Sequence, residues 1–409
     1  MFDILSGLRI VEAASFIAAP SCALHAAQLG AEVIRIDQIG GGPDFKRWPL
    51  SRSGDSFYWE GLNKGKKSIA VDLSSAEGRE LAAALITAPG EDAGLFVTNF
   101  PATGFLSHDR LAERRPDLIT ARIMGWADGQ TALDYTVNAA VGFPLMTGPS
   151  ALGDEPVNHV LPAWDIAAGL YAAFALVAAE RKRLKTGQGG EIRVPLADVA
   201  MAFAGHLGMI GEVTESGTDR PRHGNDLFGS WGRNFATGDG KQIMLVAITR
   251  PQWADLIKTL GVEQEIAALE TSLGLSLAKD DGLRFKHRDA INAIVAPAVA
   301  HRSLAEWRQV FDGTRVCWSP YLKVSEAMTE KGMFGDSPLF SSVAHQSGYT
   351  YPTPGAAVDF VDSIRQSPVR APRLGENTEE VLADLLGLPT QEIAKLHDQG
   401  VVAGDSGND

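Results

Sequence analysis

The sequence predicts an α/β protein with two domains, the larger of which is built on a parallel sheet. Short apolar runs alternate with helical patterns through the first third of the chain, as they do in βαβ units. With 409 residues, 45% of them hydrophobic and 21% charged, the chain can bury two sizeable cores. We expect a large domain over residues 1–215 with 335–409, and a smaller α/β domain with linkers over 216–334.

Apolar runs predict parallel strands in the large domain at 8–13, 31–37, 68–73, 95–99, 118–123 and 191–196. A helix over 20–29 joins the first two strands, and Ser74 with Glu77 forms a capping box for a helix that ends near Ile86. The turn after the first strand, AASFIAAP, lacks the G-x-G-x-x-G spacing that cradles a pyrophosphate. The sheet is therefore Rossmann-like without a dinucleotide fingerprint, and we expect neither a nicotinamide nor a flavin cofactor.

The second half of the chain differs from the first in composition and in the elements it predicts. Residues 205–240 are rich in Gly, Asp, Asn and Arg, which predicts a crossover and a mobile loop. The small domain is then predicted to contain strands at 242–248 and 315–318 and helices at 252–260, 288–300 and 304–311. Prolines after residue 335 predict an extended return segment, and two helices at 377–386 and 390–400 complete the chain.

Composition excludes several classes of partner. A net charge of −13 argues against nucleic acid, because phosphate recognition needs clustered Lys and Arg. Cys22 and Cys317 lie far apart without metal-ligand spacing, so we expect no metal and a reduced, cytoplasmic setting. The start, MFDILSGLRI, has no basic leader, and the longest apolar run, 166–179, is too short to span a bilayer. We therefore expect neither export nor a membrane partner.

Asp165 stands at the start of that apolar run, which predicts a helix buried on nearly all sides. Charged residues from Glu180 onward mark the exposed end of the helix, and Gly187 supplies a left-handed stop. An aspartate at a helix start is most often a structural N-cap. Because no cation follows within the next turns, the same position also fits a reactive carboxylate in a cleft.

Two basic clusters interrupt the acidic chain. Lys46 and Arg47 follow a glycine-rich turn, and Lys64, Lys66 and Lys67 lie together in the loop NKGKKS. A lysine run of this kind is commonly a solvated surface loop. It is equally consistent with a phosphate site, because close cations focus their field locally in an otherwise acidic protein.

Several long strings resemble the family III CoA-transferases, the group of formyl-CoA and carnitine CoA-transferases. They include LSGLRIVEAASFIAAPSCALHAAQLGAEVIRID, LNKGKKSIAVDL, TGQGGEIRVPLAD and RLGENTEEVLADLLGL, and together they span the whole chain. The strings APGEDAGLFVTNFPA, DYTVNAAVGFPLMTGP and VNHVLPAWDIA resemble the branch that moves CoA between the two carboxylates of one diacid, mesaconate.

The resemblance implies an interlocked homodimer, a small-molecule acyl-CoA substrate and no cofactor beyond the CoA of that substrate. It implies that CoA is held by Phe16 and Ala18 after the first strand, Val71 after the lysine loop, and Asn99 and Phe100 after the fourth strand, and we add Lys67 of the lysine loop to this set. A basic family position is Gln38 here, so we expect Arg35 or Lys67 to replace that phosphate contact.

The resemblance also implies that Asp165 is the catalytic nucleophile, which forms anhydride and aspartyl-CoA intermediates with the substrate. The cation that holds the free carboxylate of the diacid is left open among Arg47, His206, Arg222 and His223, each of which is also a common structural residue. Where formyl-CoA members carry a glycine lid, this chain has NDLFGSWG at 225–232. A bulkier lid favours a diacid that is retained.

Three other functions are alternatives to CoA transfer within one diacid. A family racemase would need a histidine beside Asp134 and Tyr135, and that position is Leu133 here. An intermolecular transferase with a dicarboxylic acid acceptor shares every residue named above and stays an alternative. A CoA-binding scaffold without activity would tolerate loss of the nucleophile, so the presence of Asp165 argues against it.

Overall fold

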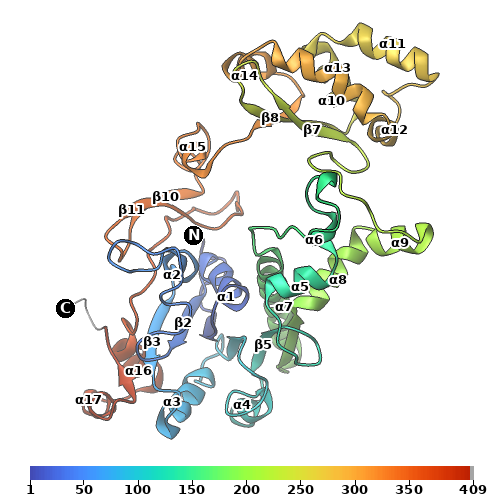
Figure 1. Ribbon diagram of the computed structural model, residues 1–409. Helices are drawn as coiled ribbons and strands as arrows, with labels where there is room; N and C mark the ends of the chain where they lie inside the picture. Colours follow the sequence, from blue (N-terminus) through green and yellow to red (C-terminus); the bar gives the residue numbers. More distant parts are fainter. Residues whose placement is uncertain (406–409) are drawn as a thin grey trace. The chain divides into compact units, whose positions relative to one another are not determined.

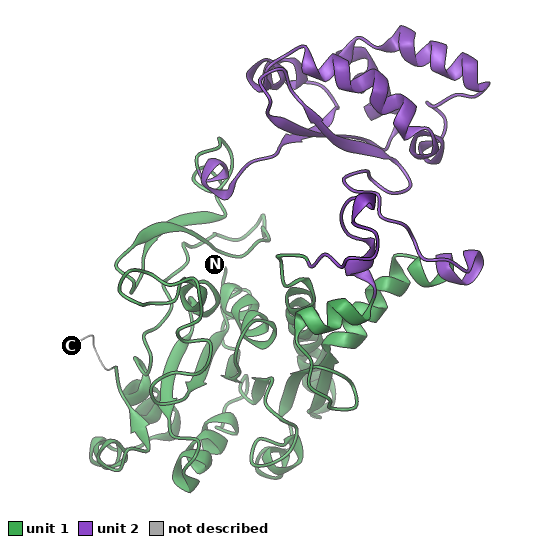
Figure 2. Ribbon diagram, viewed as in Figure 1, with its two compact units in different colours: residues 1–141, 159–211, 329–409 green, residues 142–158, 212–328 purple. Residues whose placement is uncertain are grey.

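The chain divides into two compact units in the computed structural model, which describes residues 1–405 (Figure 2). The large unit comprises Met1–Val141, His159–Gly211 and Thr329–Asp409, and the small unit comprises Gly142–Asn158 and Glu212–Met328. The expected domains differ in that residues 142–158 and 212–215 group with the small unit and residues 329–334 with the large one.

The large unit is built on a seven-stranded sheet of order β12-β3-β2-β1-β4-β5-β6 (Figure 1). Its strands are β1 (Arg9–Ala13), β2 (Glu32–Asp37), β3 (Lys67–Val71), β4 (Leu95–Thr98), β5 (Ile119–Met124), β6 (Gly190–Pro195) and β12 (Val402–Ala403). Strands β1 to β6 are parallel, and β12 pairs antiparallel with β3. This confirms the predicted α/β class and parallel sheet.

Helices cover both faces of this sheet. Helices α1 (Ala18–Gln28) and α7 (Ala163–Thr186) pack together on one face, where they meet Ile10 and Leu95. Helices α3 (Ala76–Ile86) and α16 (Thr378–Leu386) pack on the other, against Val11 and Phe96. Adjacent strand residues thus point to opposite faces, and both faces are apolar, as parallel strands require.

The remaining elements of the large unit extend this core. Its other helices are α2 (Phe57–Asn63), α4 (His108–Arg114), α5 (Asp134–Ala140), α8 (Leu196–His206) and α17 (Thr390–Asp398). The predicted extended return segment contains a hairpin of β10 (Phe340–Ala344) and β11 (Thr350–Pro354). Ser75, rather than Ser74, caps α3, because its side chain accepts the Gly78 N–H.

Helix α7 corrects two expectations. It runs for 24 residues, so its length and composition alone would allow it to cross a membrane, contrary to the estimate from residues 166–179. It packs on α1, β5 and β6, the position of a core helix. Within one chain the helix is not buried on all sides, because Leu170, Phe174 and Val177 are largely exposed.

The small unit has its own core around an antiparallel sheet of β7 (Trp231–Ala236), β8 (Gln242–Ala247) and β9 (Cys317–Pro320). Its helices are α6 (Phe143–Met146), α10 (Arg250–Leu260), α11 (Glu263–Leu273), α12 (Asp281–Lys286), α13 (Arg288–Ala300), α14 (Leu304–Phe311) and α15 (Val324–Ala327), with a short 3₁₀ helix at Ser150–Leu152. The predicted loop 205–240 is wrong in part, because it contains α9 (Met209–Ser216) and β7. Trp231 of NDLFGSWG is core and 1% exposed, so any lid ends before it.

Candidate functional site

A cavity of about 600 Å³ lies in the large unit where three neighbouring parallel strands end. Its walls are the turns that follow β1, β4 and β5, namely residues 15–18, 99–103 and 124–133, together with Asp165 of α7. The chain passes from β1 to β2 on one side of β1 and returns to β4 on the other. Ligands bind α/β sheets at such a topological switch point, where successive connections diverge.

Asp165 lies in the first turn of α7 but does not cap it. The helix begins at Ala163 after Pro162, so the interpretation of Asp165 as the N-cap is wrong. The helix N-terminus is instead satisfied from a distant element. One carboxylate oxygen of Asp134, on α5, accepts the N–H of Trp164 at 2.7 Å and the N–H of Asp165 at 3.1 Å.

Asp134 is itself fixed by a histidine. Its other carboxylate oxygen lies 3.0 Å from Nε2 of His159, and its side chain is 2% exposed. The His159 ring contacts the rings of Tyr135 and Trp164. A single carboxylate thus joins α5, the segment before α7 and the first turn of α7.

The environment of Asp165 favours its protonated form. Burial and, to a smaller extent, the Asp134 carboxylate raise the pKa of Asp165 to about 7, against the opposing effect of the Arg47 guanidinium. A carboxylate in this setting is more basic than one in water, which is the property of an activated acid, base or nucleophile.

The turn after β1 has a strained residue. Phe16 has φ of 68°, a left-handed conformation that is uncommon for a residue with a bulky side chain. The backbone N–H of Ser15 donates to Oδ1 of Asn99 at 3.1 Å, and Nδ2 of Asn99 donates to the Ser15 carbonyl at 2.8 Å. The Phe16 N–H donates to Asp44 at 3.2 Å. These bonds lock the turns after β1 and β4 to each other.

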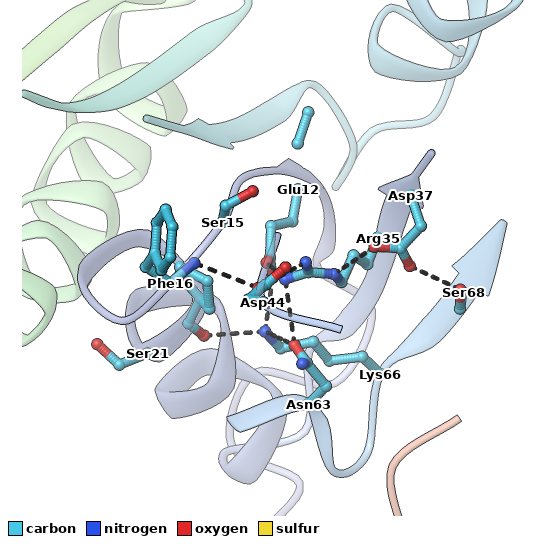
Figure 3. Close-up of polar contacts among 12 residues, drawn as sticks. Glu12, Ser15, Phe16, Ser21, Arg35, Asp37, Asp44, Asn63, Lys66 and Ser68 are labelled. Carbon is cyan, nitrogen blue, oxygen red and sulfur yellow. Dashed lines mark hydrogen bonds and ion pairs between the residues drawn. The ribbon is translucent and has the colours of Figure 1, made fainter. Parts of the chain in front are cut away.

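Beneath this turn lies a buried charge network (Figure 3). Arg35, 1% exposed, donates to Glu12 and Asp37 at 2.7 Å and to Asp44 at 3.0 Å. Lys66 donates to Glu12 at 2.7 Å. Asp44 therefore links the network to the Phe16 N–H, and the strained turn rests on Arg35.

The lysine loop is not the exposed cluster expected from its composition. Lys64 and Lys66 are each 5% exposed; Lys64 donates to the Gly61 carbonyl, and Lys66 is held by Glu12 and Asn63. Lys67 is partly exposed and paired with two glutamates. The solvated-loop interpretation is wrong for the first two, and a free phosphate-binding trio is not present. A phosphate role for Lys67 alone stays a prediction.

Four of the predicted CoA contacts lie together in the cavity wall, namely Phe16, Ala18, Asn99 and Phe100. Val71 does not, because it is fully buried in the core between β3 and α16. Arg35 cannot replace the basic position lost at Gln38, since it is buried among three carboxylates.

The four cations predicted to hold the substrate carboxylate lie in different places. The Arg47 guanidinium stacks on the Phe16 ring at 5.3 Å and on the Tyr58 ring at 5.2 Å, and its charge reaches Asp165. His206 is exposed on α8 and does not line the cavity. Arg222 is 7% exposed and donates to three carbonyls of residues 147–155 in the small unit, where His223 stacks on Phe228.

Sequence reasoning missed three members of the site. Tyr58 lies in the FYW start of α2, which reads as an ordinary apolar helix; burial raises its pKa, and Arg47 lowers it. Arg122 lines the cavity and donates to the carbonyls of Phe100 and Pro101, which holds that turn. The sequence pointed to Asp134 only as part of a racemase pattern.

Comparisons with known proteins show what the chain as a whole is similar to. The model of CoA-transferase family III matches residues 5–378. The 2-methylfumaryl-CoA isomerase of Chloroflexus aurantiacus is 49% identical over 99% of each chain. The human succinyl-CoA:glutarate CoA-transferase is 28% identical over 97% of this chain and 90% of the relative. A CAIB/BAIF family crystal structure from Brucella suis superposes with a TM-score of 0.75 at 23% identity, covering 94% of this chain and 100% of that one.

Replacing Arg35 with methionine should strongly destabilise the fold. The change leaves the carboxylates of Glu12, Asp37 and Asp44 buried beside one remaining cation, which costs roughly 3–5 kcal/mol. Urea unfolding followed by circular dichroism measures the loss. Arg114→Met is the matched control, because its pair with Glu80 is exposed and worth about 0–1 kcal/mol. Equal losses in the two variants would contradict the role given to Arg35.

Replacing Asp165 with asparagine should stabilise the protein at alkaline pH. The raised pKa means that the folded state holds a proton which the unfolded state releases near pH 4, so this stability is present at low pH and lost as pH rises through about 7. Above that pH the ionised carboxylate costs free energy that asparagine removes. We expect Asp165→Asn to gain on the order of 2–4 kcal/mol at pH 8 and little at pH 4. Urea unfolding at both pH values checks this, and a gain that is independent of pH would contradict it.

Proposed function

Because this chain belongs to CoA-transferase family III, we propose that it moves CoA between the two carboxylates of one 2-methylfumarate (mesaconate) molecule. The observation that carries the proposal is Asp165, a half-buried carboxylate of raised pKa in the wall of the cavity at the switch point. The identity to the Chloroflexus isomerase along both chains supports the choice of substrate.

In the first half of the reaction Asp165 is the nucleophile. A carboxylate oxygen attacks the thioester carbon at C1 of the diacid, the C–S bond breaks, and CoA leaves as a thiolate. The product is a mixed anhydride of Asp165 and the diacid. The thiolate then attacks the aspartyl carbonyl, the anhydride C–O bond breaks, and the C1 carboxylate is released beside an aspartyl-CoA thioester.

The second half repeats these steps at the other end of the diacid. The C4 carboxylate attacks the aspartyl-CoA thioester, and CoA leaves again as a thiolate. The thiolate attacks the C4 carbonyl of the new anhydride, which restores the Asp165 carboxylate and gives the C4 thioester. Each bond broken is matched by one formed, and no proton is gained or lost overall.

The geometry supports separate places for CoA and diacid. We assign to CoA the part of the cavity wall formed by Phe16, Ala18, Asn99 and Phe100. Lys67 and Val71 lie on β3, outside this wall. Among the predicted cations, Arg47 fits the free carboxylate best, because its charge reaches Asp165 and the residue is exposed. A diacid held there would keep its second carboxylate near the nucleophile.

Purified enzyme given the C1 thioester of mesaconate alone should form the C4 thioester until equilibrium. Because the diacid is retained, isotope-labelled free mesaconate should enter the thioester pool far more slowly than the isomer forms. Chromatography with mass detection over time gives both rates.

Asp165→Ala is the control for this experiment and should abolish isomerisation while acyl-CoA still binds, since the contacts to CoA lie elsewhere in the cavity. Label exchange as fast as isomerisation, or a requirement for an added acid, would replace the proposal with an intermolecular transferase. Normal turnover by the Ala variant would remove Asp165 from its role.

We also propose that the chain forms a homodimer through the exposed apolar side of α7. Leu170, Phe174 and Val177 line an apolar pocket there with residues 356–358 of the return segment. Monomeric proteins rarely leave such a face uncovered. The interlocked arrangement expected from the sequence would cover it with a second copy.

Phe174 offers a direct test of this dimer, since its side chain is 74% exposed on α7. Phe174→Lys should lower the dimer fraction at micromolar concentration in light scattering, because an interface core excludes a lone charge. Val324→Lys, at an equally exposed residue of the small unit, is the control and should leave the mass unchanged. A monomeric wild-type protein would contradict the proposal.

A further inference from the structure

We propose that Asp134 is a positioning residue: its carboxylate accepts the backbone N–H groups at the start of α7, so these donors are not available to the carboxylate of Asp165. The proposal rests on the proposed role of Asp165 as nucleophile. It adds a residue on another helix whose charge and hydrogen bonds set the reactivity of that nucleophile.

The first step of the argument is the assignment of donors. An aspartate in the first turn of a helix normally gains from nearby backbone N–H groups and from the positive end of the helix dipole. In this chain the N–H groups of Trp164 and Asp165 both point to one oxygen of Asp134. The hydrogen bonds that would stabilise the Asp165 carboxylate, and so make it a weak nucleophile, are thus made to Asp134.

The second step is orientation. His159 lies 3.0 Å from the far oxygen of Asp134, so both carboxylate oxygens are engaged and the group cannot rotate towards Asp165. The Asp134 side chain is 2% exposed, and its charge is therefore little screened by water. A fixed, buried negative charge beside Asp165 disfavours ionisation and favours attack on an acyl carbon, which removes that ionic repulsion.

Other groups also face the start of α7 and enter the pH dependence of Asp165. Arg47 and Tyr58 act on it directly from the loop before α2 and from α2. The titratable or charged side chains on other elements packed against α7 or lining the cavity are Cys22 and His25 on α1, Arg122 on β5, Asp128 in the loop after β5, Tyr135 on α5, Glu191 and Arg193 on β6, and Asp198 and His206 on α8. None of these is changed by a substitution at Asp134, so comparison of variants isolates its effect.

The test is the pH profile of kcat/KM for isomerisation in Asp134→Asn. The amide retains an oxygen for the Trp164 and Asp165 N–H groups but removes the charge. Activity requires ionised Asp165, so it falls as pH drops through the Asp165 pKa. We expect the acid limb to move down by about one pH unit in the variant, because one close charge shifts a carboxyl pKa by about that amount. A purely structural role for Asp134 would lower the rate without moving this limb.

Two further variants sharpen the result. Asp280→Asn removes another helix-capping aspartate, at the start of α12 in the small unit, and should leave the acid limb in place. Asp134→Ser, which is uncharged and leaves room for a water at the helix start, carries the same test if the amide variant does not fold. An acid limb that stays at the wild-type pH in both uncharged variants would overturn the proposal.

Trapping separates this inference from the proposed function. Hydroxylamine added during turnover should convert the Asp165 anhydride or thioester to a hydroxamate that peptide mass spectrometry locates. No adduct at Asp165 in the wild-type enzyme would defeat the proposed function itself. An adduct at Asp165 together with an unmoved acid limb in the Asp134 variants would defeat only the positioning role.

Discussion

The buried ion cluster around Arg35 is the constraint on which the site depends. Arg35 joins β1 to β2 through Glu12 and Asp37, and its bond to Asp44 holds the loop that carries Arg47. Asp44 in turn accepts the N–H of Phe16 and maintains its left-handed backbone. Removal of any one partner leaves a charge in an apolar interior, so the cluster behaves as a unit and fixes the cavity wall before any substrate binds.

Local patterns in the sequence predicted much of the fold and the place of Asp165 at the start of a long helix, because strand period and helix stops act over a few residues. The strands near Arg9, Glu32 and Leu95 and the left-handed stop at Gly187 are of this kind. Partners far apart in sequence could not be predicted. The Asp134 cap of α7 spans some thirty residues. Lys66, just before β3, pairs with Glu12 on β1, so composition alone suggested an exposed loop.

The region around Asp165 shows how function is supported by structure elsewhere. The half-buried Asp165 lies close to the buried Asp134, an arrangement that costs stability and that a core built only for stability would avoid. The cost is tolerated because α7 is anchored along its length on α1, β5 and β6. The strained Phe16 is tolerated for a similar reason, since bonds from two separate segments define its position.

The closing edge of the sheet has a consequence for how the protein is made on the ribosome. β3 pairs with β12, and its backbone N–H groups at Ser68 and Ala70 are taken by the side chains of Asn377 and Thr378. These partners are translated some three hundred residues later. Until then the backbone groups on this edge of β3 have no partner. The nascent large unit therefore has high contact order and is exposed to mispairing. Truncated or stalled chains should therefore depend on chaperones far more than the finished protein does.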